Sequence, residues 1–382
     1  MEEPYNKIKY DIDNLNELQI FQLFFSDEII ELFVEESSNY YKKVLIDTYG
    51  TNYIKIIKGS SGNSISFPYL FITKGITKED ILGFIGIKLY MGLHHLADVK
   101  SYWSKGTRFK NVGLIMSKNN FFLLLRAFHF PEKDKNNKLS KRYEKNPKNA
   151  PRNQVNLYIE KLSKNFQKYY VLGKNIKIDE SSEHFKRNPS KKFEFKLHLL
   201  SDYNTHYLYN MFFVQDKKGN FEKSSLFNEN IVLNLLSCLN NDKKPRNLFF
   251  DEYYSSNDLM KKISSIGFLN ATVLRVNSKE MKLKKINNIA NEGKNNNIKD
   301  AFDYDIGFSS IERNTKKWYK NILFLGIDAC ILNAKILYES KTGKAYPISE
   351  FKEKIFDLIL DMFLNKENNN NKDNIFENNN KK

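Results

Sequence analysis

The stretch "NLFFDEYYSS" (residues 247–256) decides how the rest of the sequence is interpreted. Its first four residues suit a buried strand, and Asp251 follows them directly, ahead of a polar turn that begins with Glu252. An Asp after an apolar strand is commonly a turn or cap residue. The ends of strands in open sheets are also where ligands bind. Both interpretations of Asp251 stay open unless other carboxylates converge on the same place.

The sequence around this stretch alternates strand-like and helix-like segments. Strands are expected at 175–180, 195–203, 205–216, 247–250 and 271–276, with helices at 155–169, 228–239 and 256–268. A long amphipathic helix is expected at 318–339. The order β-β-β-α-β-α-β is that of a ribonuclease-H-like core, so we predict an α+β (mixed α/β) fold with a mixed five-stranded sheet.

Two strands of this predicted sheet end in aspartate. Asp179 ends the first strand and Asp251 the fourth, and a ribonuclease-H-like sheet sets these strands side by side and parallel. "KDAFDYD" adds Asp300 and Asp303, three residues apart on one helical face. Each acid taken alone is explained as a turn or cap residue. Together they suit two Mg²⁺ or Mn²⁺ ions about 4 Å apart, the arrangement used for phosphoryl transfer.

The charge balance favours a polyanionic partner. Lys and Arg outnumber Asp and Glu by 61 to 45, a formal net charge of +16, and nucleic acid is the commonest polyanion. Biased codon usage remains an alternative explanation of this composition. Cys238 and Cys330 each lie in an apolar run, which predicts buried, reduced thiols and an intracellular protein. No Cys/His cluster has zinc spacing, which excludes a zinc finger.

The sequence predicts neither a secretory signal nor a membrane partner. The N-terminal residues are too acidic and polar for a signal peptide. No uncharged apolar run reaches the roughly 18 residues that a membrane span needs. Composition also sets the expected domain limits. These are an N-terminal segment 1–24, an all-helical domain 25–130, a charged linker 131–154, the core 155–340 with a short insertion 277–299, a helical segment 341–364 and a disordered Asn/Lys-rich tail 365–382.

Five ordered blocks resemble the piggyBac-type transposases and the host proteins derived from them, across roughly residues 25–340. Two helical blocks are similar to that family's dimerisation and DNA-binding domain, and three are similar to its catalytic blocks. They are "ILGFIGIKLYMGLHHLADVKSYWS" (81–104), "MSKNNFFLLLRAFHF" (116–130), "IDESSEHFKRNPSKKFEFKLHLLSDY" (178–203), "NLFFDEYYSSNDLMKKISSIGFLNATVLRVN" (247–277) and "RNTKKWYKNILFLGIDACILNAKILYE" (313–339).

The resemblance implies a DNA transposase or a domesticated derivative, a DDD-type enzyme that cleaves and transfers strands with two metal ions. The family's first and second acids correspond to Asp179 and Asp251. Its third and auxiliary acids correspond to Asp300 and Asp303. The implied metal ligands are therefore Asp179, Asp251 and Asp300, with Mg²⁺ or Mn²⁺ as the ion and Asp303 as a supporting acid.

Double-stranded DNA is the implied partner, together with a second copy of the chain or a related transposase subunit, and the nucleus is the implied location. Near the predicted acids, basic and aromatic residues are the candidate DNA contacts. They are Lys186, Arg187, Lys191, Lys192, Lys196, Arg313, Lys316, Lys317 and Trp318. The lysines near Asp179 are equally explained as plain surface residues, and Trp318 either packs under the third acid or stacks on a base.

Several positions depart from the family pattern. Glu252 replaces an Asn, Tyr304 replaces a Gln, and "NIK" (297–299) replaces two glycines before the third acid. Asp300 lies only 49 positions after Asp251, where the family inserts a longer β-rich subdomain. Two alternatives therefore stand beside the enzyme. One is a catalytically inactive DNA-binding or scaffold protein derived from such a transposase, and the other is a relic without function.

Overall fold

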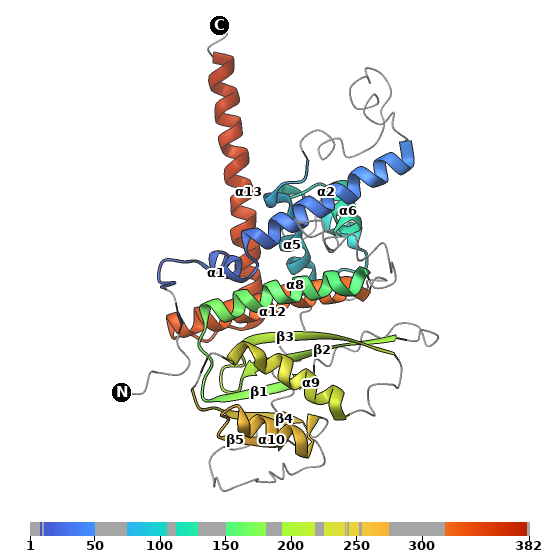
Figure 1. Ribbon diagram of the computed structural model, residues 1–382. Helices are drawn as coiled ribbons and strands as arrows, with labels where there is room; N and C mark the ends of the chain where they lie inside the picture. Colours follow the sequence, from blue (N-terminus) through green and yellow to red (C-terminus); the bar gives the residue numbers. More distant parts are fainter. Residues whose placement is uncertain are drawn as a thin grey trace. The chain divides into compact units, whose positions relative to one another are not determined.

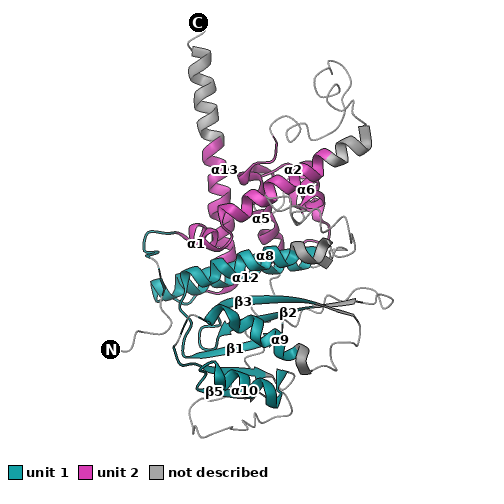
Figure 2. Ribbon diagram, viewed as in Figure 1, with its two compact units in different colours: residues 1–15, 152–310, 315–345 teal, residues 16–151, 311–314, 346–382 magenta. Residues whose placement is uncertain are grey.

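A computed structural model describes most of the chain in two compact units, coloured separately in Figure 2. Unit 1 comprises residues 1–15, 152–310 and 315–345, and unit 2 comprises residues 16–151, 311–314 and 346–382. Each unit therefore combines segments from early and late in the sequence. The residues that the structure describes are 8–9, 11–49, 75–104, 112–128, 150–180, 193–217, 225–240, 242, 244–251, 254–274 and 318–379.

Unit 1 is built on one mixed five-stranded sheet with the strand order β3-β2-β1-β4-β5, which confirms the predicted strand number and type (Figure 1). β2 runs antiparallel to both of its neighbours, β1 and β3, while β1, β4 and β5 run parallel to one another. The strands are β1 (Asn175–Glu180), β2 (Phe193–Asp202), β3 (Leu208–Lys217), β4 (Asn247–Asp251) and β5 (Asn270–Leu274).

The helices of unit 1 connect and cover these strands. α9 packs on β2 and β3, and α10 packs on β5. α8 and α12 lie along each other, and the Tyr158 hydroxyl of α8 donates to the Leu323 carbonyl of α12 at 3.0 Å. A Cβ on Gly326 would meet that hydroxyl at 2.6 Å, so glycine permits the close approach. The helices are α8 (Ala150–Tyr169), α9 (Ser225–Leu236), the 3₁₀ turn η5 (Ser237–Leu239), α10 (Asn257–Ser265) and α12 (Trp318–Thr342).

Side chains of α8 and α12 bond to the backbone of the edge strand β3. The Asn333 amide donates to the Leu208 carbonyl and accepts from the Leu208 N–H, both at 2.8 Å. The Ser163 hydroxyl accepts from the Met211 N–H at 3.1 Å. Backbone groups on an edge strand would otherwise offer a template for pairing with another chain. The two helices thus hold β3 in place and form hydrogen bonds with backbone N–H and C=O groups of this edge strand.

α12 is the central apolar helix of unit 1. Among the described residues it alone is long and apolar enough to cross a membrane, over Tyr319–Thr342, but 83% of its most apolar window is buried inside the protein. That burial accounts for its composition as a core helix. Cys330 lies within it and is buried, as predicted. Cys238 is only partly buried, because it sits in the 3₁₀ turn after α9, where its thiol bonds to the Leu235 carbonyl.

Within its described residues, the elements of unit 2 are all helices. Its central helix, α5, begins at the predicted capping box, in which Thr77 and Asp80 exchange hydrogen bonds. Gly83 and Gly86 let α13 approach, since a Cβ at Gly83 would lie 2.9 Å from the Phe363 ring. The elements are α1 (Glu17–Phe24), α2 (Asp27–Tyr49), α5 (Lys78–Leu93), the 3₁₀ turns η2 (Val99–Trp103) and η3 (Val112–Leu114), α6 (Lys118–Ala127) and α13 (Ile348–Asn379).

The two ends of the chain differ from the expected domain limits. α13 runs to Asn379, into the stretch 365–382 that composition predicts to be a disordered tail. Its first half packs against α5, and extending an existing helix is far easier than starting one, so Asn-rich sequence can continue it. At the other end, residues up to Leu15 belong to unit 1, while Asn16 caps α1 in unit 2. The segment 1–24 is therefore not one piece.

Candidate active site at the carboxyl ends of β1 and β4

The pairing of β1 with β4 puts two acidic positions next to each other. The strands are parallel, and their last paired residues are Ile178 and Phe250. Asp179 and Asp251 are the next residues of the same two strands. Neighbouring strands lie about 4.8 Å apart, so the two backbone positions share one level at the carboxyl edge of the sheet. The strand adjacency expected from the element order is confirmed, while the catalytic role of the two acids stays a prediction.

Asp179 is held by its own strand. Its side chain is 23% exposed, and its Oδ2 accepts from the Lys177 ammonium at 2.5 Å. Its Oδ1 accepts from the Glu180 N–H at 2.9 Å. Lys177 is itself buried, with a side chain only 9% exposed. Sequence reasoning missed this lysine, although a Lys between two isoleucines and two residues before an Asp could have indicated it.

Lys196, a predicted DNA contact, lies on β2 and pairs with an acid. Its ammonium is 3.2 Å from the Glu180 carboxylate, and its side chain is 15% exposed. Glu180 is opposite His198 in the antiparallel register of β1 and β2, so the Lys196–Glu180 pair is on the other face of the sheet from Asp179. The side chain of Lys196 therefore already has an acidic partner. Its DNA-binding role stays a prediction.

The turn that follows Asp251 is anchored at two points. The Tyr254 hydroxyl and His198 Nδ1 form a buried hydrogen bond of 2.6 Å. The Ser256 hydroxyl caps α10 and donates to Glu229 Oε1 of α9 at 2.8 Å. β2 and α9 thus each hold one residue of the segment that leads into α10. Neither anchor was predicted, since each joins residues far apart in sequence.

The electrostatics of these anchors differ. Burial lowers the pKa of His198 to about 3, so the ring is neutral near pH 7 and serves as a hydrogen-bond partner. Its Nε2 has no hydrogen-bond partner among the described residues. Hydrogen bonds from Lys262 and Ser256 lower the pKa of Glu229, which stays ionised and accepts from the Lys262 ammonium at 2.7 Å.

Most of the other predicted site residues lie outside the described residues. The backbones of Asp251 and Trp318 are described, at the end of β4 and the start of α12, but their side chains are not. Among the described side chains, no group of three or more His, Cys, Asp or Glu could hold a metal. The predicted residues outside the described ranges are Asp300, Asp303, Lys186, Arg187, Lys191, Lys192, Arg313, Lys316 and Lys317.

The donor chemistry at this edge suits a hard divalent ion. Oxygen ligands are those that Mg²⁺ and Mn²⁺ prefer, and Asp179 supplies a carboxylate there. The Lys177 ammonium at Asp179 Oδ2 is a cation already standing at that oxygen. A divalent ion at Oδ2 would therefore have to displace this ammonium.

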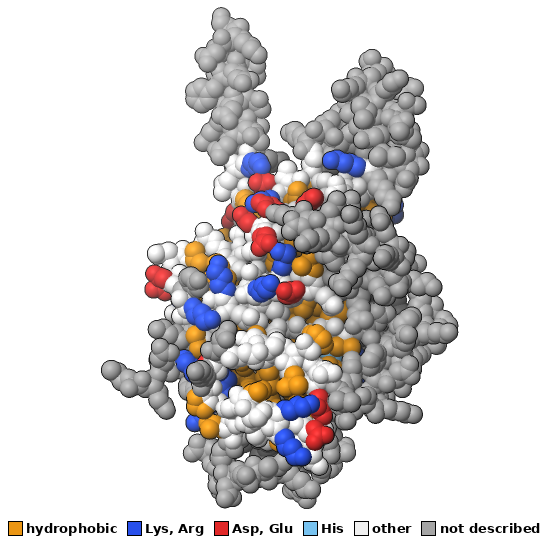
Figure 3. All heavy atoms as spheres, in the orientation of Figure 1, with side chains coloured by type: hydrophobic (Ala, Val, Ile, Leu, Met, Phe, Trp, Pro, Cys, Tyr) orange, Lys and Arg blue, Asp and Glu red, His pale blue; other side chains and the backbone are white. Residues whose placement is uncertain are grey.

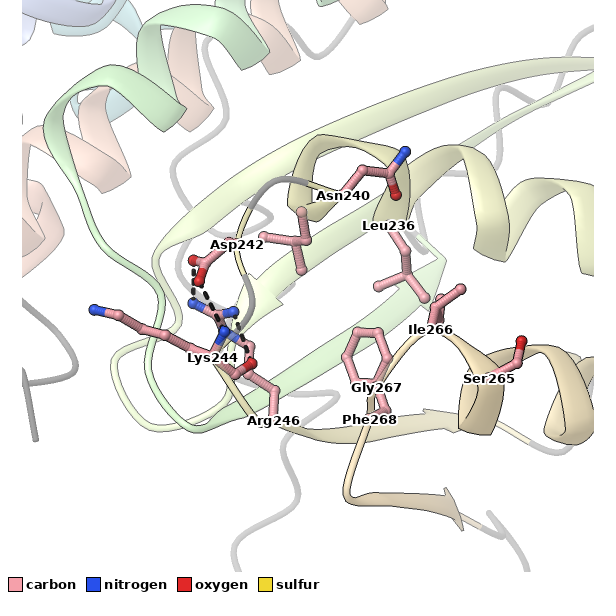
Figure 4. Close-up of a pocket in the computed structure, with 10 residues that line it drawn as sticks. Leu236, Asn240, Asp242, Lys244, Arg246, Ser265, Ile266, Gly267 and Phe268 are labelled. Atoms are coloured by element: carbon pink, nitrogen blue, oxygen red, sulfur yellow. Dashed lines mark hydrogen bonds and ion pairs between the residues drawn. The ribbon is translucent and has the colours of Figure 1, made fainter.

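A separate pocket of about 440 Å³ lies at the opposite ends of the strands (Figure 4). It is lined by the end of α9, the loop before β4 and the turn between α10 and β5. Arg246 beside it is buried, with its guanidinium bonded to Asp242 at 2.7 Å and to the Gly173 carbonyl at 3.2 Å. These bonds tie the starts of β1 and β4 together, so the charged groups here have structural partners and are remote from Asp179.

The described surface carries no single basic patch on the face drawn in Figure 3. Lys and Arg side chains there are scattered among acidic and apolar ones. The net charge of the whole sequence is nonetheless +16. For the residues that the structure describes, the DNA-binding prediction therefore rests on that overall charge and not on a basic patch in this view.

The mixed five-stranded sheet, with Asp179 and Asp251 at one level of its adjacent parallel strands β1 and β4, is the arrangement of a ribonuclease-H-like core. Residues 16–306 match the family model described as Transposase IS4, which covers most of the chain. The chain therefore belongs to the Transposase IS4 family.

A solved structure titled "Cryo-EM structure of piggyBac transposase synaptic complex with hairpin DNA" is similar to this chain in fold. The TM-score is 0.69 at 16% sequence identity, and the match covers 95% of this chain and 84% of that one. The predicted resemblance to piggyBac-type transposases is thus confirmed for the fold, including its ribonuclease-H-like core. Among curated proteins, no match was found.

Proposed function

We propose that this chain is a piggyBac-like DNA transposase, or a domesticated derivative, that cleaves and transfers DNA strands with two divalent ions. The observation that carries the proposal is the adjacency of the Asp179 and Asp251 positions at the carboxyl edge of β1 and β4. Membership of the Transposase IS4 family supports it. The similar solved structure is, by its title, a complex with hairpin DNA, which supports double-stranded DNA as the partner here.

Each acid has a role in this proposal. Asp179 and Asp251 hold the ions from the sheet, Asp300 completes the site, and Asp303 supports it. Mg²⁺ or Mn²⁺, when bound there, activates an attacking water or hydroxyl and stabilises the leaving oxygen. Tyr254 and Ser256 are held by His198 and Glu229 in the segment before α10, which supports a preorganised site at this end of β4.

The remaining proposed roles concern DNA and assembly. The basic residues near the acids contact phosphates, which makes binding weaken steeply as salt rises. They are the residues predicted from the sequence, Lys186, Arg187, Lys191, Lys192, Lys196, Arg313, Lys316 and Lys317, with Trp318 beside them. The protein acts in the nucleus as a homodimer or with a related transposase subunit.

A second candidate function is DNA binding without catalysis. The span of 49 positions between Asp251 and Asp300 favours it, because the resembling family places a longer insertion there. The ion pair between Lys177 and Asp179 also favours it, since the ammonium occupies an oxygen that a metal would need. In this role the chain would bring DNA to an active partner.

A plasmid-nicking assay in Mg²⁺ or Mn²⁺ separates the two candidates. The wild type is compared with Asp251→Asn and with Asp258→Asn, which removes one carboxylate from an exposed position on α10 and serves as the matched control. The enzyme proposal expects nicking by the wild type and the control, and none by Asp251→Asn. Nicking that does not require the divalent ion rejects the enzyme proposal. Equal nicking by all three proteins rejects it as well. Salt-sensitive DNA binding without any nicking supports the second candidate.

A further inference from the structure

Lys177 is a charged residue between two buried isoleucines of β1. Its neighbours Ile176 and Ile178 are fully buried, and its own side chain is 9% exposed. A lysine is almost never buried unless its charge is paired. Its position therefore requires a partner, and the kind of partner defines what the residue does.

The partner is the first predicted metal ligand. Residues two apart on a strand point to the same face, so Lys177 and Asp179 are neighbours on one face of β1. The Lys177 ammonium lies 2.5 Å from Asp179 Oδ2, while Oδ1 accepts from the Glu180 N–H at 2.9 Å. Both carboxylate oxygens are thus engaged, and the charge of the Asp is matched by a cation from its own strand.

A second lysine–carboxylate pair nearby provides a contrast. Lys196 of β2 pairs with Glu180 at 3.2 Å, on the opposite face of the sheet. Its side chain is 15% exposed, comparable to that of Lys177. Both pairs therefore join a lysine to a carboxylate at similar depth in the same sheet, but only the pair with Lys177 includes a residue proposed to bind metal.

An ammonium and a divalent ion compete for a carboxylate oxygen. Two cations close together in a partly buried site repel each other, and the site screens this repulsion less than water does. Charge-assisted hydrogen bonds are also about twice as strong as neutral ones, so Asp179 does not release Lys177 without cost. Metal binding at Oδ2 requires the Lys177 ammonium to withdraw.

We propose that Lys177 is a built-in counter-ion that occupies the metal-binding oxygen of Asp179 in the metal-free protein and sets the affinity of the site for divalent ions. This inference rests on the proposed function, because it takes Asp179 as a metal ligand. In the metal-free protein Lys177 also neutralises Asp179, which allows the edge of the sheet to form before any ion binds. The residue acts through Asp179 and not on DNA.

Binding of Mn²⁺ to the full chain, followed by the electron paramagnetic resonance signal of the free ion, tests the proposal without any activity measurement. Lys177→Met keeps the length and apolar stem of the side chain but removes its charge. We expect it to bind Mn²⁺ roughly tenfold more tightly than the wild type. Lys335→Met, which breaks a similarly buried lysine–carboxylate pair with Glu339 on α12, is the matched control and should bind as the wild type does. Asp179→Asn should bind much more weakly.

The outcomes separate the proposed role of Lys177 from the existence of a metal site at Asp179. If Asp179→Asn weakens binding but Lys177→Met binds no tighter than the wild type, Lys177 is not a competitor and the inference is overturned while the metal site stands. If Asp179→Asn binds as tightly as the wild type, the metal site itself fails. Thermal melting adds a second readout, in which Mn²⁺ should raise the Tm of Lys177→Met more than that of the wild type. If Lys177→Met does not fold, Lys177→Gln takes its place in both measurements.

Discussion

The buried hydrogen bond between His198 and Tyr254 predicts an acid-sensitive core. In the folded protein burial holds the pKa of His198 at about 3, whereas an unfolded His titrates near 6.5. Between these two pH values His198 is protonated in the unfolded chain and neutral in the folded protein. The contribution of the neutral His198 side chain to the free energy of unfolding is therefore complete above about pH 6.5. It is lost as the pH falls towards 3.

The size of the effect follows from the two pKa values. One unit of pKa difference corresponds to about 1.4 kcal/mol, so the free energy of unfolding should fall by about 2 kcal/mol between pH 8 and pH 5 through His198 alone. The full difference, reached near pH 3, is about 5 kcal/mol. That is a large fraction of the stability of an ordinary domain.

Urea unfolding at pH 8, 6 and 5 measures this loss. Trp103→Phe leaves Trp318, at the start of α12, as the one tryptophan, so its fluorescence reports on unit 1. In that background His198→Gln should keep a hydrogen-bond partner for Tyr254 and lose about 2 kcal/mol less than its parent from pH 8 to pH 5. His206→Asn, which removes a half-buried imidazole from the turn before β3, should behave as the parent. If His198→Gln loses as much stability as its parent, the buried neutral imidazole is not the cause and the reasoning is refuted.

Three further changes test the packing of unit 1. Asn333→Leu removes both hydrogen bonds to Leu208 and should lower the free energy of unfolding by about 2 to 4 kcal/mol in urea titrations; a loss below about 1 kcal/mol would show that the edge strand finds other partners. Gly326→Ala brings a methyl group against the Tyr158 hydroxyl and should cost about 1 to 3 kcal/mol, seen as a lower Tm. An unchanged Tm would mean that α8 and α12 can separate freely. Glu229 has a lowered pKa, so its contribution is present above about pH 4.5 and disappears as acid protonates it. Glu229→Gln should flatten the acid limb of the stability curve, and a curve that stays parallel to the wild type below pH 4.5 contradicts this.

The sheet could be predicted because its signals are local. Apolar runs that end in Asp179 and Asp251 mark strand ends, and the helices between strands force β1, β4 and β5 to run parallel. Adjacency of the two acids then follows from the element order. The helical continuation to Asn379 was not predictable from composition, because it depends on α13 packing against α5 early in its length.

The partners of the acids were harder to predict. The bond between His198 and Tyr254 joins residues 56 positions apart, and its existence depends on the register between β1 and β2. A one-residue slip would turn His198 to the other face. Lys177 was visible in the sequence, but only its burial beside Asp179 shows that it is more than a surface lysine.

The two interleaved units have a consequence for synthesis on the ribosome. In unit 1 the Lys341 ammonium of α12 bonds to the Ile12 carbonyl at 2.6 Å, and in unit 2 α13 packs on α5. Neither unit can therefore complete its fold until a segment near the end of the sequence has been translated. At 5–20 residues per second, roughly 13 to 50 s pass between completion of α5 and arrival of α13. During that interval the glycine-lined face of α5 is uncovered, which makes the nascent chain a client for chaperones. A fragment that stops near residue 345 would leave this face uncovered permanently.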